Sequence, residues 1–98
     1  MENEIGGNAM TYKDANNQVI HLIIRVPKAD AAFTYFQLEA NEGLSFYSTL
    51  EESLKESYRD ITIKAHTGLE QELRQVLNTL HKTVPFEILE DVTKEDSL

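Results

Sequence analysis

The stretch from Ala31 to Gly43 predicts a helix with two defined ends, and it lies between two strand-like segments. Apolar residues recur along it at helical spacing, at Ala29, Ala32, Phe33, Phe36 and Ala40. Asp30 suits the N-cap, because its carboxylate can accept a hydrogen bond from an N–H group of the first turn. Gly43 suits the stop, because glycine adopts a positive φ without steric cost. We therefore expect the rings of Phe33 and Phe36 to cover a sheet.

Outside this stretch the sequence predicts four strands and a second helix. Runs of β-branched residues and apolar alternation indicate strands over Val19–Val26, Leu44–Leu50, Asp60–His66 and Phe86–Leu89. The second helix, Leu69–Leu80, carries a stripe of leucine and valine and follows the capping pattern Thr-x-x-Glu that begins at Thr67. The segment Glu51–Arg59 is compatible with either a loop or a short helix.

The expected order of elements is β-α-β-β-α-β. Two right-handed crossovers in this order give a four-stranded antiparallel sheet with both helices on one face, which is the α+β ferredoxin-like plait. Its strands lie in the order fourth, first, third, second. We expect a single domain over residues 18–90, with a flexible N-terminal arm at 1–17 and an acidic tail at 91–98. The expected core contains Ile20, Leu22, Ile24, Phe33, Phe36, Phe46, Ile61, Ile63, Leu73, Val76, Leu77 and Leu80.

A resemblance to a known family is carried by the same region. The run Arg25-Val26-Pro27, the segment from Phe33 to Gly43 and the threonine Thr49 are followed by a helix over Leu69–Leu80. In these features the chain resembles a small bacterial family, domain of unknown function 4911. The resemblance spans most of the chain. The family has no assigned activity, so the resemblance implies a fold and no catalytic residue.

Composition excludes several classes of function. The chain has 98 residues, no cysteine and a formal net charge of −8. Without cysteine there is no disulfide, thiolate nucleophile or cysteine-based zinc site, and the acidic charge argues against binding to nucleic acid or an anionic membrane. No apolar run approaches the roughly 20 residues that span a bilayer, and the acidic start lacks the pattern of a signal peptide. We therefore expect a cytoplasmic protein.

The helix-free face of the predicted sheet is the candidate binding surface. The pairs expected across the two central strands are Ile23–Lys64, His21–His66 and Arg25–Thr62. This register places on the open face His21, Ile23, Arg25, Tyr47, Lys64, His66 and Glu87. These side chains could hold a partner or a small anion. A sheet covered on one side also requires polar residues on its other side, so a merely solvated face is the alternative.

The sequence contains no catalytic or metal-binding motif. His21 and His66 fall short of the three protein ligands of a catalytic zinc site, and Glu87 is a distant third candidate. Glu39 and Glu42 lie three residues apart and could act as acid and base, although a solvated turn with basic neighbours is the interpretation that we favour. There is no nucleophile elbow and no glycine-rich phosphate loop. We expect no enzymatic activity, no cofactor and no metal.

Two functions of different classes stay open. The first is a non-catalytic interaction or regulatory module that pairs with itself or with a protein partner through its sheet. Apolar residues on the open face, Ile23, Tyr47 and Leu89, favour it. The second is a sensor domain that binds a small anionic metabolite at the cations of that face, by analogy of fold alone. RNA binding is disfavoured, because the central strands lack paired aromatic residues and the net charge is negative.

Overall fold

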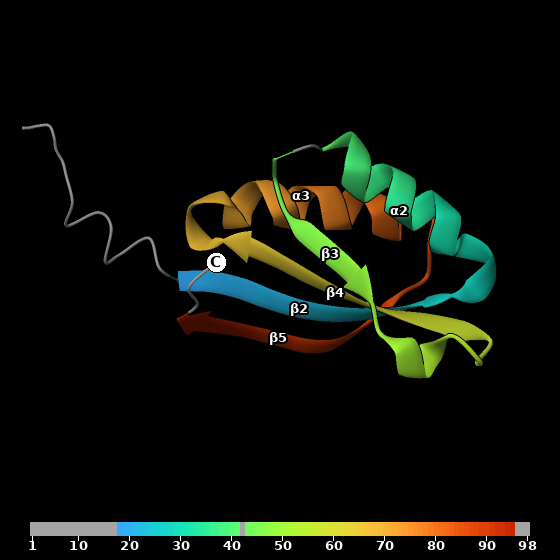
Figure 1. Ribbon diagram of the computed structural model, residues 1–98. Coiled ribbons are helices and arrows are strands. Elements are labelled where there is room, and N and C mark those ends of the chain that lie inside the picture. Colours follow the sequence, from blue (N-terminus) through green and yellow to red (C-terminus); the bar gives the residue numbers. More distant parts are fainter. Residues whose placement is uncertain (1–17, 42, 96–98) are drawn as a thin grey trace, which may run out of the picture.

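The computed structural model describes residues 18–41 and 43–95. They form a four-stranded antiparallel sheet with two helices on one of its faces (Figure 1). The elements are β2 (Gln18–Pro27), α2 (Ala31–Ala40), β3 (Phe46–Thr49), β4 (Tyr58–His66), α3 (Glu70–His81) and β5 (Glu87–Glu95). Short 3-10 turns lie at Lys28–Asp30, Glu51–Ser53 and Thr67–Leu69. The α+β class is confirmed, while the predicted N-terminal arm at 1–17 lies outside the described residues.

The strand order is β3-β4-β2-β5, so β2 and β4 are the central strands and are antiparallel. The predicted register between them is wrong by two residues. The structure places Ile23 opposite Thr62, His21 opposite Lys64, and Arg25 opposite Asp60. A shift of two residues preserves the two faces of each strand, so hydrophobic alternation does not distinguish these registers. The observed register gives Arg25 a carboxylate where the predicted one gave it a threonine.

β5 extends well beyond the predicted short strand. It runs to Glu95 and pairs with nearly the whole length of β2, with a bulge between Ile88 and Glu90. The acidic residues expected in a tail at 91–98 therefore belong to a strand as far as Glu95. Almost every residue of β5 is exposed, so its pairing depends on backbone hydrogen bonds to β2 and leaves little apolar pattern to detect.

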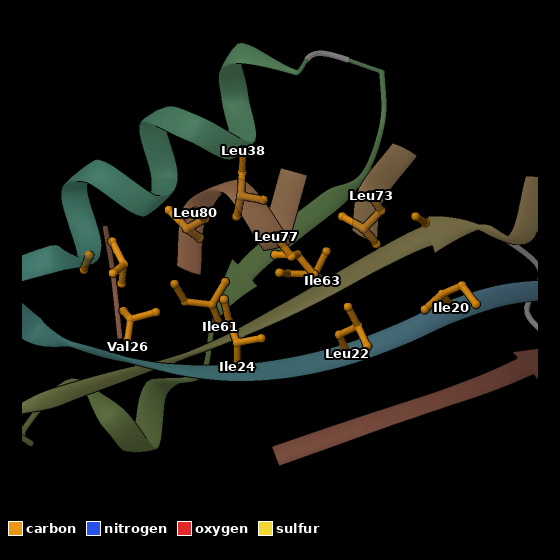
Figure 2. Packing of buried hydrophobic residues seen from close by; sticks show 13 residues of the cluster. Ile20, Leu22, Ile24, Val26, Leu38, Ile61, Ile63, Leu73, Leu77 and Leu80 are labelled. Atoms are coloured by element: carbon orange, nitrogen blue, oxygen red, sulfur yellow. The ribbon is translucent and has the colours of Figure 1, made fainter. Parts of the chain in front are cut away.

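The core lies between the sheet and the two helices (Figure 2). β2 and β4 supply the alternate residues Ile20, Leu22, Ile24, Val26, Ile61, Ile63 and Ala65, and α3 supplies Leu73, Leu77 and Leu80. These residues agree with the predicted core for β2, β4 and α3, except that Val76 is only half-buried. Among the described helices, none is long and apolar enough to cross a membrane.

The predicted buried face of α2 is wrong. Phe33 and Phe36 are 42% and 64% exposed, whereas α2 buries Ala31, Thr34 and Leu38. Thr34 tolerates burial because its hydroxyl donates a hydrogen bond to the carbonyl of Asp30 at 2.9 Å. The spacing of the two rings is helical, but it marks the outer side of the helix.

The predicted ends of the helices are only partly correct. Gly43 has a φ of +84°, as predicted, although α2 itself ends at Ala40. Asp30 occupies the N-cap position of α2, but its side chain makes no capping hydrogen bond. At α3 the predicted cap from Thr67 is not formed; instead the His66 side chain accepts a hydrogen bond from the N–H of Gly68 at 3.1 Å.

The two faces of β3 are reversed relative to the prediction. Tyr47 lies opposite Ile63 and packs against the core, and Phe46 lies opposite Lys64 and is 68% exposed. The Tyr47 ring stacks on Tyr35 with ring centroids 5.6 Å apart, and its hydroxyl donates to a carboxylate oxygen of Glu39. The Tyr47 ring packs under α2, and its hydroxyl reaches the edge of the core, where it has a hydrogen-bond partner.

Candidate functional site

The candidate site is the helix-free face of the sheet, hereafter the open face. Cross-strand partners share a face, so it is defined by the residues that pair with alternate positions of β2 and β4. They are Val19, His21, Ile23, Arg25 and Pro27 on β2, Phe46 and Ser48 on β3, Tyr58, Asp60, Thr62, Lys64 and His66 on β4, and Glu87, Glu90, Val92 and Lys94 on β5, and of these Val19 is buried. Five of the six predicted site residues belong to this face, and Tyr47 does not.

Arg25 is held at one end of the open face by a carboxylate and a ring. Its guanidinium donates two hydrogen bonds to Asp60, from Nε at 2.8 Å and from Nη2 at 3.0 Å. It also lies over the ring of Tyr58, 3.8 Å from the centroid. The bond to Asp60 raises the pKa of Arg25 above its ordinary value. The carboxylate of Asp60 therefore balances the positive charge of Arg25 within the chain.

His21 lies near the middle of the open face, beside a carboxylate of β5. Its Nδ1 is 3.0 Å from an oxygen of Glu90, and its side chain is 15% exposed. Nδ1 of His21 makes no hydrogen bond within the described residues, so the contact with Glu90 is one of charges when the imidazole is protonated. Lys94 approaches the same carboxylate at 3.8 Å. Beside them, the hydroxyls of Ser48 and Thr62 are 2.9 Å apart.

The predicted cations do not converge on one point. His66 pairs with Val19 at one end of β2, whereas Arg25 pairs with Asp60 near the other end. Six residues separate these positions on β2, which is about 20 Å at the rise of a β-strand. A small anion therefore cannot touch both Arg25 and His66, whereas Lys64, two residues from His66 on β4, lies close to His66 on this face.

Exposed apolar side chains are interspersed with these pairs. Phe46 and Val92 are 68% and 40% exposed, and they lie in the same cross-strand row, with Lys64 and His21 between them. Ile23 is half-buried in the next row. The sequence prediction missed Phe46 and Val92, because the alternation of a four-residue strand fits either phase and because β5 was expected to end earlier.

The predicted acid–base pair and the predicted metal ligands do not form a chemical site among the described residues. Glu39 accepts the hydrogen bond of Tyr47, and this bond raises the pKa of Tyr47. Glu42, its predicted acid–base companion, lies outside the described residues. In the ranges 18–41 and 43–95, no three histidine, aspartate or glutamate side chains are placed to hold a metal ion.

A groove of about 400 Å³ lies beside α3, away from the open face. Its lining combines the apolar residues Leu77, Phe86 and Ile88 with the basic residues Arg74, His81 and Lys82. The ring of His81 meets the ring of Phe86 edge-on, with centroids 4.7 Å apart. The guanidinium of Arg74 is already bonded to Glu70 and Asp91, so Lys82 is the main uncompensated charge of the groove.

Comparison of the chain with protein families, with curated proteins and with solved structures finds no significant match. The resemblance to domain of unknown function 4911 therefore stays a prediction.

Proposed function

We propose that the protein is a non-catalytic interaction module with a ferredoxin-like fold, which self-associates through the open face of its sheet. Read from β5, the strand order is the fourth, first, third and second along the described chain, which supports the ferredoxin-like assignment. The proposed location is the cytoplasm, as the sequence predicts. The net charge of −8 favours a protein partner over a nucleic acid.

The exposure of Phe46 is the observation that carries the proposal. A phenylalanine that is 68% exposed on a sheet, in one row with an exposed Val92, is typical of a surface that another protein covers. The charged neighbours of these residues support this interpretation. Arg25 and His21 lie against Asp60 and Glu90 of the same chain, so a partner need not supply opposite charges.

Energetics favour a contact made by several apolar residues. Full burial of one phenylalanine side chain contributes about 1.5–3 kcal/mol, and in a two-fold dimer each residue contributes twice. Association costs about 4–15 kcal/mol of translational and rotational freedom. Phe46 alone therefore does not suffice, and we expect Val92 and Ile23 to be covered as well.

The sensor alternative has less support on the open face, because Arg25 is occupied by Asp60 and lies several residues along the strands from Lys64 and His66. A small apolar molecule with an anionic group would find a better match in the groove beside α3. That groove combines apolar residues with Lys82, and among the described residues none that lines it is acidic.

The test is the molar mass in solution of the parent and of two matched variants. Phe46→Glu introduces a charge into the proposed contact, where its desolvation opposes association, and we expect the molar mass to halve. Phe36→Glu makes the same change at a phenylalanine that is 64% exposed on α2, and we expect it to keep the parent mass. A monomeric parent at high micromolar concentration, or an equal loss in both variants, contradicts the proposal.

A further inference from the structure

β5 is an edge strand, and within the described part of the chain no strand pairs with its outer side (Figure 1). Its residues are exposed, apart from the half-buried Glu90. An edge strand presents N–H and C=O groups that can pair with a strand of another molecule. The bulge near Ile88 disrupts one end of β5. The regular part is Glu90–Glu95, which pairs without interruption with Gln18–Ile23.

The charges along β5 complement themselves in one antiparallel register. A two-fold axis through Val92 places Val92 beside its own copy and places Glu90 of each chain opposite Lys94 of the other. On the opposite side of the strand, Asp91 then faces Thr93. This register contains opposite-charge pairs on both sides of the axis and no pair of like charges.

The neighbouring registers lack this match. An axis through Asp91 places two Asp91 carboxylates opposite each other, and an axis through Thr93 places Asp91 opposite Glu95. Axes through Glu90 or Lys94 bring identical charges together. Like charges directly opposite each other destabilise a strand pair, so the charge order favours the axis through Val92.

We infer that β5 pairs with β5 of a second copy of this chain, antiparallel and centred on Val92, to form one continuous sheet. This inference rests on the proposed self-association and adds a second interface to it. The edge contact leaves Phe46 uncovered, because Phe46 lies on β3 at the other border of the sheet. Where the two-fold axes of both contacts cross at right angles, the protein is a closed tetramer, and the loss of either contact halves its molar mass.

The experiment exchanges the two charges of β5. Lys94→Glu sets Glu90 against a glutamate of the partner, and Glu90→Lys sets Lys94 against a lysine, so each variant alone should weaken the edge contact at least about tenfold. A one-to-one mixture of the two variants regains opposite charges at every pair, and the parent molar mass should return. Lys55→Glu makes the same charge change in an exposed turn away from β5 and should keep the parent mass.

Each outcome decides between the two contacts. If Lys94→Glu keeps the parent mass, or if the mixture stays at the mass of the single variants, the edge pairing is refuted. If the molar mass falls with Phe46→Glu but not with Lys94→Glu, only the open-face contact is supported. If it falls with Lys94→Glu but not with Phe46→Glu, only the edge pairing is supported and the open-face contact is refuted. A monomeric parent refutes both. Circular dichroism checks folding, and the milder Lys94→Gln serves if Lys94→Glu unfolds.

Discussion

α3 and α2 pack on the same face of the sheet, but they use different kinds of side chain to do so. α3 buries Leu73, Leu77 and Leu80 and places charged residues outside. α2 buries an alanine, a threonine and a leucine, and it turns Phe33 and Phe36 toward solvent. A helix can therefore be anchored by small residues that fit closely to a sheet, and a helical spacing of large rings does not by itself identify the buried face.

Truncation of one large side chain from each helix tests this contrast most strongly. Leu73→Ala removes a side chain that is fully buried, and we expect a loss of about 2–5 kcal/mol in the free energy of unfolding. Phe36→Ala removes a larger side chain that is mostly exposed, and we expect a change within about 0.5 kcal/mol. Urea unfolding measures both. Equal losses in the two variants would show that α2 also anchors the sheet with its rings.

The turn after α2 depends on one glycine. Gly43 has a φ of +84°, and a Cβ atom at this position would meet no atom within 4 Å. Gly43→Ala therefore costs backbone strain alone, and we expect a loss of about 1 kcal/mol or more. Gly68→Ala is the comparison without backbone strain, because Gly68 lacks a positive φ; its added Cβ would lie 3.3 Å from Nδ1 of His66, close enough that the ring has to shift. Equal stability of Gly43→Ala and the parent would contradict the role of Gly43.

The buried threonine of α2 offers a finer test. Thr34→Val keeps the shape of the side chain and removes the hydroxyl that bonds to the carbonyl of Asp30. We expect a loss of about 0.5–1.5 kcal/mol, the usual net value of one hydrogen bond. Thr79→Val makes the same change on the exposed side of α3 and should be nearly neutral. Thermal unfolding compares the two, and an unchanged midpoint for Thr34→Val would show that the hydroxyl is dispensable.

The same contrast explains which parts of the fold the sequence could predict. β2, β4 and α3 are marked by β-branched alternation or leucine spacing, and their buried faces were predicted correctly. α2, β3 and β5 bury few large residues, so their sequence pattern determines neither which of their faces is buried nor where they end. The open face was predicted in outline, but Phe46 was assigned to the core and Tyr47 to the surface. The half-buried Tyr47 ring stacks on Tyr35 and its hydroxyl donates to Glu39, and no local pattern reveals either contact.

The register of the central strands was a different kind of error. Hydrophobic alternation repeats every two residues and therefore accepts a shift of two. The pairing of Arg25 with Asp60 distinguishes the alternatives, because a guanidinium and a carboxylate on adjacent strands gain from lying directly opposite each other. Charge pairs across strands thus supply information that apolar patterns lack, and this principle also singles out the register proposed for two copies of β5.

The polar contacts that hold the two helices to the sheet also differ. Arg74 of α3 donates two hydrogen bonds to Asp91 of β5, both at 2.9 Å, so this contact joins two charges. Tyr47 of β3 donates its phenolic proton to Glu39 of α2, so this contact needs a neutral phenol. Arg74 lowers the pKa of Asp91, and Glu39 raises the pKa of Tyr47.

These pKa shifts predict opposite pH dependence for the two contacts. The stabilisation by Asp91 is complete above its unfolded pKa of 3.8 and is lost as the pH falls through the lower folded value. The stabilisation by Tyr47 is complete below its unfolded pKa of 10.0 and is lost as the pH rises through the higher folded value. Both groups are near the surface, so we expect each contact to contribute only about 0.2–1 kcal/mol.

The test compares the parent with Asp91→Asn and with Tyr47→Phe by urea unfolding at several pH values. The difference between the parent and Asp91→Asn should be present near neutral pH and shrink as the pH falls below 3.8. The difference between the parent and Tyr47→Phe should be present near neutral pH and shrink above about pH 10. A difference for Asp91→Asn that is constant from neutral to acid pH would show that Asp91 acts through packing, because only the loss of its charge can remove the attraction to Arg74.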